Sequence, residues 1–278
     1  MADISGLDHV IIAVGDLDAG EAAMRRLGFR TTPRGYHSAH MGTANSTIVF
    51  ADRTYFEVLG PVAETEANRP IREGLAAGRA LFGVAMKTED AAAAQAGFAA
   101  RGISDGPVND FSRPVALPEG AREAAFRTTN ISAEASPGAY AFVCQHLTPE
   151  LVWRPDYLEQ ENGVVGLKEV VACSSDLAAA EAGWARILPG AVRRATEDVI
   201  VDFGNGQLHY LAPPTYRARF GAPPAVDPGL GALVFASADM ARTRALLSGA
   251  GAVFKEEGGQ LLLPATEACG VTFAFRAA

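Results

Sequence analysis

The chain of 278 residues contains few lysines and few cysteines. With three lysines, most of its cations are arginines, and a formal net charge of −8 leaves no excess of positive charge for nucleic-acid phosphates. The three cysteines are odd in number and far apart, so they provide neither a disulfide framework nor a CxxC metal motif. We therefore expect no nucleic-acid partner and no disulfide-stabilised fold.

Segments that would direct the chain to a membrane are also missing. No apolar run reaches the roughly 18 residues of a transmembrane helix, and Met1–Ser5 contains no basic region leading into an apolar run. We expect a cytoplasmic protein without a membrane partner. The sequence also lacks the GxGxxG fingerprint, the phosphate-binding P-loop and the GxSxG nucleophile elbow, which argues against dinucleotide sites, P-loop sites and serine hydrolase sites of the α/β type.

The most informative feature of the sequence is an internal repeat. Residues 6–22, GLDHVIIAVGDLDAGEA, align without a gap with residues 166–182, GLKEVVACSSDLAAAEA. The identities include an Asp-Leu pair and a Glu-Ala pair, so we interpret the match as an internal duplication. The second copy has Glu169 at the position of His9 in the first copy.

Hydrophobic patterning predicts four strand–helix–strands units, which begin near residues 7, 81, 167 and 232. One such unit cannot bury its apolar sheet face alone, and two units side by side would form a curved sheet with a concave face suited to a ligand or a metal. Residues 106–119 are marked by prolines, residues 213–228 form a second Pro-rich connector, and 147–161 is the best linker candidate. The fold class expected is α+β.

This layout and three motifs resemble the vicinal oxygen chelate superfamily, the group of glyoxalase I, extradiol dioxygenases and bleomycin-resistance proteins. The motifs are LDHVIIAVGDLDA at 7–19, HMGTANSTIVFADRTYFEVLGP at 40–61 and FVCQHLTPELVWRP at 142–155. The resemblance implies four βαβββ modules paired into two glyoxalase/bleomycin-resistance/dioxygenase-type domains. We predict a first domain at residues 1–155, which carries the active cup, and a second, diverged domain at 156–278.

The resemblance also implies a divalent metal ion bound by His9 and Glu57 on neighbouring strands. An imidazole and a carboxylate suit Zn, Ni, Mn, Co or Fe. From the residues alone, a simple hydrogen bond between His9 and a nearby glutamate is the alternative. The second unit should supply a third ligand, but its first strand offers Phe82 and Gly83, which cannot bind a metal.

The last strand of the second unit offers the adjacent residues Gln145 and His146. Neighbouring strand residues point to opposite faces, so one of them faces the cup. We favour His146 as the third metal ligand, with the alternative that it ends the strand and caps the linker. Gln145 and Asn45 are candidate substrate-binding residues.

Two further sets of side chains have two interpretations each. His40, which with His37 precedes a Gly-Thr-Ala-Asn turn, is a candidate acid or base beside Glu57, or else a surface residue. Glu169 and His209 in the second half repeat the Glu–His pair with exchanged positions. They form either a second metal site or an ion pair left after the duplication.

Two functions are consistent with this sequence. The first is a metal-dependent isomerase, lyase or dioxygenase that acts on a small substrate with two neighbouring oxygens. The second is a metal-free protein of the same fold that binds and sequesters a small molecule, which the missing ligand in the second unit favours. In both cases the partner is a small molecule, and a homodimer is compatible with the sequence.

Overall fold

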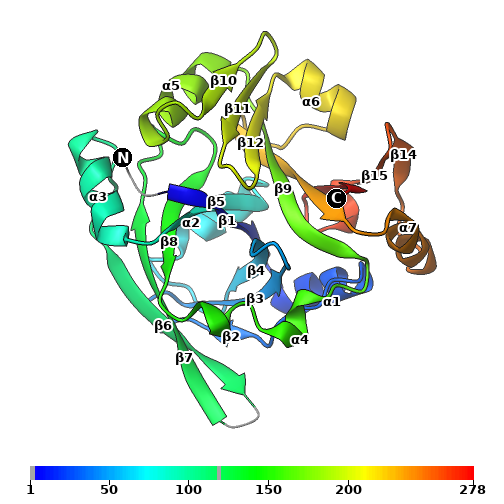
Figure 1. The fold of residues 1–278 in the computed structure, drawn as a ribbon, viewed down its shortest axis with the longest axis horizontal. Coiled ribbons are helices and arrows are strands. Elements are labelled where there is room, and N and C mark those ends of the chain that lie inside the picture. Colours follow the sequence, from blue (N-terminus) through cyan, green and yellow to red (C-terminus); the bar gives the residue numbers. More distant parts are fainter. Residues whose placement is uncertain (1–3, 118–119) are drawn as a thin grey trace.

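The computed structural model describes residues 4–117 and 120–278, which form two eight-stranded sheets with helices around them (Figure 1). The strand order is β2-β3-β4-β1-β5-β8-β7-β6 in the first sheet and β10-β11-β12-β9-β13-β16-β15-β14 in the second. The α+β class and the paired modules are therefore confirmed. Residues 1–3 of the N-terminal segment and residues 118–119 of the Pro-marked segment lie outside the described residues.

The four units follow one another along the chain. The first contains β1 (Ile4–Ala13), α1 (Leu17–Arg26), β2 (Gly35–Tyr36), β3 (Thr43–Val49) and β4 (Tyr55–Pro61). After α2 (Arg69–Ala76), the second contains β5 (Leu81–Thr88), α3 (Ala91–Ala100), β6 (Asn109–Leu117), β7 (Gly120–Asn130) and β8 (Tyr140–His146). The Pro-marked segment is thus largely the edge strand β6, where a proline is tolerated because it loses no ladder hydrogen bond.

The second half repeats this order after a short linker. The linker holds η1 (Pro149–Leu151) and α4 (Pro155–Leu158), so the predicted domain boundary falls within α4. The third unit contains β9 (Val164–Cys173), α5 (Leu177–Ile187), β10 (Val192–Arg194), β11 (Asp198–Asp202) and β12 (Gln207–Leu211). After α6 (Pro213–Phe220), the fourth contains β13 (Gly229–Ser237), α7 (Met240–Gly249), β14 (Lys255–Glu257), β15 (Gln260–Leu263), η2 (Ala265–Glu267) and β16 (Thr272–Ala277).

The same local signal begins the helix of every unit. The N-cap residues are Asp16, Asp90, Asp176 and Asp239, and each carboxylate accepts a hydrogen bond from a backbone N–H two or three residues later. This cap satisfies one of the donors that a helix start leaves free and fixes the turn from strand to helix. The four units therefore share a capping device as well as a strand order.

Central strands join the units in pairs. Strand β1 pairs in parallel with β4 of its own unit and antiparallel with β5 of the next, and β9 does the same with β12 and β13. The convex faces of the two sheets share one hydrophobic core. In this core the ring centroids of Phe29 and Phe50, from the first half, lie 5.5 and 5.8 Å from that of Phe235 in the second half. The halves are packed together through this aromatic cluster.

The two concave faces differ in what covers them. Helix α6 packs on the second sheet, where Tyr216 is fully buried against a cluster that includes Val171 and Val234. A Cβ atom on Gly231 would lie 2.4 Å from the Tyr216 hydroxyl, so the glycine provides room for this ring. Of the two cavities described below, the larger is lined by residues of the first half, and the smaller one by residues of the first half and Tyr157 of α4. In the part of the chain that the structure describes, no helix is both long and apolar enough to span a bilayer.

Replacement of Tyr216 by alanine should destabilise the second half because it empties the space that α6 fills. We expect a loss of about 3–5 kcal/mol in the free energy of unfolding, typical for the removal of a buried aromatic ring. Urea unfolding monitored by circular dichroism measures it. Val253→Ala, at an exposed position, is the control and should change the value by less than about 0.5 kcal/mol. An equal effect of both substitutions would show that α6 does not support the fold.

Candidate functional site

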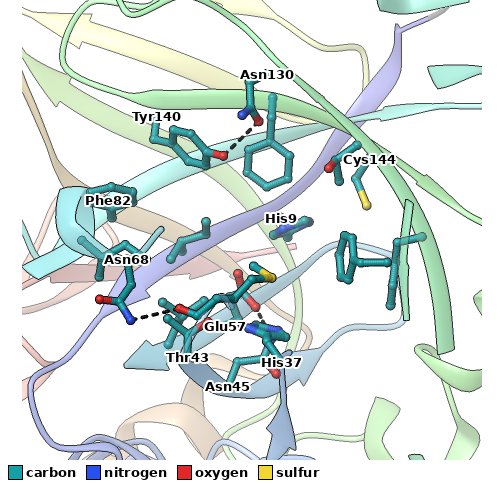
Figure 2. Close-up of a pocket in the computed structure, with 18 of the residues that line it drawn as sticks. His9, His37, Thr43, Asn45, Glu57, Asn68, Phe82, Asn130, Tyr140 and Cys144 are labelled. Atoms are coloured by element: carbon teal, nitrogen blue, oxygen red, sulfur yellow. Dashed lines mark hydrogen bonds between the residues drawn. The ribbon is translucent and has the colours of Figure 1, made fainter. Parts of the chain in front are cut away.

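A cavity of about 400 Å³ lies over the concave face of the first sheet. Its apolar wall consists mainly of aromatic and aliphatic side chains, among them Ile11, Leu59, Phe82, Phe111, Phe126 and Phe142. Its polar residues include His9, His37, Asn45 and Glu57 (Figure 2). The volume and the apolar lining with a few polar groups are typical of a small-molecule site.

His9 and Glu57 reach this cavity from adjacent parallel strands. In the β1–β4 register, His9 is opposite Tyr55 and Ile11 is opposite Glu57, so the two side chains lie on the same face of the sheet. Both are buried, with 4% and 7% of their surfaces exposed. Glu57 accepts a hydrogen bond from the Asn45 side-chain amide. The structure therefore brings His9, Glu57 and Asn45 to one cavity.

Asp8 connects His9 to a second histidine. The β1–β5 register shifts between Leu7 and His9, so Asp8 lies at a β-bulge, where the alternation of faces is interrupted. Its Oδ2 atom lies 2.6 Å from His9 Nδ1 and 2.9 Å from His146 Nε2. Because an ionised carboxylate can only accept, both of these ring nitrogens act as donors. The fully buried Asp8 carboxylate thus accepts hydrogen bonds from two imidazole rings.

The charge on Asp8 is stabilised by these neighbours. Burial alone would raise the pKa of the carboxyl, but the positive field and hydrogen bond of His146, together with those of His9, outweigh it and hold the pKa well below its usual range. Asp8 therefore remains ionised throughout the physiological range. It also fixes which nitrogen of His9 carries the proton.

The remaining nitrogen of His9 is available to a ligand. Since Nδ1 donates to Asp8, Nε2 of a neutral ring carries the lone pair, and it forms no hydrogen bond with any residue that the structure describes. The ring stacks on Tyr55 at 4.2 Å between centroids and meets the edge of Phe142 at 5.4 Å. These contacts fix the ring plane in the cavity wall. The arrangement is that of a base held in one tautomer by a buried carboxylate.

His146 and Gln145 lie on opposite faces of β8, as the alternation of strand residues predicts. His146 faces Asp8 and packs on Trp153 at 4.6 Å between ring centroids. Gln145 binds the start of α3 instead, because its amide donates to Glu89 O at 2.6 Å and accepts from Ala91 N at 3.2 Å. Neither residue is part of the described cavity lining, so Gln145 is not placed to bind a substrate there.

Of the two histidines before the Gly-Thr turn, the structure places His37 rather than His40 in the cavity wall. His40 is exposed. His37 lies opposite Thr43, whose hydroxyl is 2.7 Å from its Nδ1 atom. Burial lowers the pKa of His37, partly opposed by Glu57 and reinforced by Arg113. His37 is therefore a neutral imidazole near neutral pH, and sequence reasoning passed over it because His40 lies closer to the turn.

The second unit offers no metal ligand at the positions that correspond to His9 and Glu57. In the β5–β8 register Gly83 is opposite Tyr140 and Ala85 is opposite Phe142, which repeats the β1–β4 pattern. Gly83 and Phe142 thus occupy the two corresponding places. A Cβ atom on Gly83 would lie 2.8 Å from the Tyr140 carbonyl oxygen, so a side-chain ligand would not fit without a backbone shift.

Of the donors that do converge, Cys144 lines the cavity, whereas Asp8 and His146 are not among its lining residues. Among the described His, Cys, Asp and Glu residues, the one group of three whose ligand atoms lie within 4.8 Å of one another is Asp8, Cys144 and His146. Burial raises the pKa of the Cys144 thiol well above its usual value, with Asp8 and Glu57 adding to the effect, so the metal-free thiol is protonated. The predicted set of His9, Glu57 and His146 is not among such groups and stays a prediction.

In the second half, the corresponding pair is Glu169 and His209. His209 Nδ1 lies 4.0 Å from Glu169 Oε2, and Arg276 donates to Glu169 Oε1 at 2.5 Å. Burial would raise the pKa of Glu169, but His209, Arg276 and Arg219 together lower it. Asp198 binds the other nitrogen of His209 at 2.9 Å. Arg276 thus supplies the closest positive charge to Glu169, and the two sequence interpretations of the Glu169–His209 pair stay predictions.

Comparisons with known proteins agree with this architecture. Residues 7–188 match a family described as glyoxalase-like domain. No curated protein sequence matches the chain. A hypothetical protein from Staphylococcus aureus has a similar structure, with a TM-score of 0.65 at 11% identity, and the match covers 98% of this chain and 99% of that one.

Two further solved structures are similar over nearly the whole chain. The Mn(II)-bound glyoxalase from Novosphingobium aromaticivorans has a TM-score of 0.59 at 14% identity, with 99% of this chain and 82% of that chain covered. A mutant of 4-hydroxymandelate synthase from Streptomyces coelicolor has a TM-score of 0.56 at 10% identity, with coverages of 98% and 92%. At these identities the likeness concerns the fold. Because the family match spans more than half of the sequence and the fold agrees, the chain belongs to the glyoxalase-like domain family of the vicinal oxygen chelate superfamily.

Proposed function

We propose that this protein is an enzyme that moves a proton on a small substrate with neighbouring oxygens, and that His9 is the general base. The observation that carries the proposal is the Asp8–His9 pair, in which the carboxylate holds one ring nitrogen and the other belongs to the cavity wall. A base positioned in this way typically accelerates proton transfer by 10²–10⁴-fold.

The other polar side chains of the cavity have roles consistent with this chemistry. His9 Nε2 would take a proton from a carbon next to a carbonyl, and the electron pair left by the C–H bond would move onto the carbonyl oxygen. Neutral His37 could donate a hydrogen bond to that oxygen as its negative charge develops. Glu57, fixed by Asn45, could accept a hydrogen bond from a neighbouring substrate hydroxyl. Return of the proton to the opposite face of the same carbon inverts its configuration. Return to the adjacent carbon also requires the proton of the neighbouring hydroxyl to pass through Glu57 to the first oxygen, and it exchanges the positions of the carbonyl and the hydroxyl.

A second candidate function is metal-dependent catalysis, and the convergence of Asp8, Cys144 and His146 favours it. A carboxylate, a thiolate and an imidazole are ligands that zinc accepts, and a bound ion would supply Lewis-acid chemistry. In the cavity itself, however, Gly83 and Phe142 stand where further ligands would be needed beside His9 and Glu57. The residues there fit acid–base catalysis better than they fit a complete metal centre.

The role of His9 can be tested by hydrogen exchange. In D₂O, wild-type protein should catalyse deuterium incorporation next to the carbonyl of small α-hydroxy ketones, with and without an aromatic ring, as followed by proton NMR. His9→Gln should lower the rate by roughly 10²–10⁴-fold because it removes the base. His40→Gln is the discriminating variant. Loss of exchange in His40→Gln together with its retention in His9→Gln would contradict the proposal.

The role of Asp8 has a consequence for stability as well as rate. Asp8→Asn replaces the charged acceptor shared by two buried imidazole N–H groups with an amide and should cost about 1–3 kcal/mol in unfolding free energy at pH 7. Since the folded pKa is lowered, the stabilisation by Asp8 is complete above the usual value of 3.8 and is lost progressively as the pH falls from there through the lowered pKa of the folded state.

Urea unfolding of both proteins between pH 7 and pH 3 measures this difference. The stability gap between wild type and Asp8→Asn should narrow towards the acid end. Asp110→Asn, at an exposed carboxylate paired with Arg127, is the matched control and should differ little from wild type at any pH. A gap that stays constant down to pH 3 would show that Asp8 is not held ionised by the two histidines.

Elemental analysis separates the two candidate functions. Under the acid–base proposal, prolonged treatment with EDTA should leave the exchange rate unchanged within about twofold, as measured by the same NMR assay. Metal-dependent catalysis instead requires stoichiometric Zn, Ni, Mn, Co or Fe in protein purified without added ions, and loss of that metal in Cys144→Ala and His146→Ala. A chelator-sensitive rate that returns with one of these metals would favour the second candidate.

A further inference from the structure

One buried cation in the cavity wall has no acidic partner. Arg113, on the edge strand β6, is 7% exposed and lines the 400 Å³ cavity. Within residues 4–117 and 120–278, no carboxylate lies within 4 Å of its guanidinium, and the guanidinium donates no hydrogen bond. A buried charge is costly unless it is paired, so such a group indicates that the partner is supplied by a ligand.

The backbone makes room for this side chain. Strands β2 and β6 are opposite edges of the first sheet, and Gly35 of β2 lies against Arg113. A Cβ atom on Gly35 would lie 2.8 Å from Arg113 Nη1 and 2.9 Å from its Cδ atom. Residue 35 is also opposite Asn45, which binds Glu57. The guanidinium thus occupies a prepared place next to the polar residues of the site.

Neighbouring arginines differ from Arg113 because they already have acidic partners. A second cavity of about 220 Å³ shares Arg113, Thr47 and Val152 with the larger one and is also lined by Arg34 and Arg154. Arg34 binds Glu21 at 2.9 Å and Asp18 at 2.5 Å, and Arg154 lies 3.0 Å from Asp156. The carboxylates of Glu57 and Asp105 line the same cavity, but neither lies within 4 Å of Arg113, so this single guanidinium matches a monoanion better than a phosphate dianion.

We propose that Arg113 binds the carboxylate of the substrate, whose apolar, aromatic part lies against the phenylalanine-rich wall of the cavity. The planar guanidinium matches a carboxylate with two parallel hydrogen bonds. This inference rests on the proposed function for its site and deepens it, because it makes the substrate an aromatic carboxylic acid. Arg113 and His37 line the same cavity, so the carboxylate would share that space with the group that faces the reacting oxygen.

Ligand binding tests the proposal without any need for turnover. Isothermal titration calorimetry with three matched pairs compares benzoate with benzamide, phenylacetate with phenylacetamide, and cinnamate with cinnamamide. Each pair has nearly the same shape and differs in charge. Wild-type protein should bind at least one carboxylate with a Kd at least tenfold lower than that of its amide.

Substitutions then identify the residue responsible. Arg113→Gln should abolish the preference for the carboxylate while leaving amide binding within about threefold, and Arg113→Lys should keep part of it. Arg122→Gln, at an exposed arginine paired with Glu150, is the matched control and should keep the full preference. Circular dichroism and the melting temperature show whether each variant is folded.

The inference is overturned if no carboxylate binds wild-type protein, if acids and amides bind equally, or if folded Arg113→Gln keeps the preference. Its failure is distinguishable from that of the proposed function. Catalysis by His9 is measured by deuterium exchange, and recognition by Arg113 is measured by the acid-to-amide ratio of Kd values. Either result can be positive while the other is negative.

Discussion

The contact between the buried Asp8 carboxylate and two imidazoles is the interaction on which the rest of the site depends. Removal of a carboxylate from water is costly, and here the cost is offset by His9 and His146, which reach it from β1 and β8. These strands belong to different units and are separated in the sheet by β5. The interaction therefore both orients the His9 ring and links the two modules of the first sheet on its concave side.

The two halves of the molecule show how one architecture can be used in two ways. The first sheet keeps an open concave face lined by aromatic rings and a few polar groups, whereas α6 fills the second with Tyr216 and Phe220. The second half also retains an acid–imidazole pair, but arginines neutralise it. The two halves thus share one architecture, but the concave face of the first sheet lines a cavity and that of the second sheet is covered by α6.

Much of the fold was predictable because its signals are local. Hydrophobic patterning indicated the four units, and the alternation of strand residues indicated the opposite directions of Gln145 and His146. The family resemblance implied that His9 and Glu57 share one wall. Asp8 was missed because a bulge interrupts that alternation, and no sequence pattern marked the bulge. Arg113 was missed because the prolines around it suggested an irregular segment, although an edge strand tolerates them.

Long-range packing explains the remaining differences. The two prolines that begin α6 suggested a connector, yet proline is well suited to the first turn of a helix. Nothing in that local sequence says that the helix will lie on a sheet that ends some 50 residues later. Likewise, the position of His37 rather than His40 in the cavity wall depends on the pairing of β2 with β3. A strand of two residues leaves no recognisable pattern in the sequence.

The aromatic cluster between the sheets has a consequence for the cavity of the first half. Phe29 and Phe50 contribute to the same packing as Phe235, so the half without a ligand cavity helps to hold the other half in shape. A gene fragment that encoded the first half alone would leave these rings facing water. Loss of the second half would therefore also disturb the packing behind the cavity of the first half.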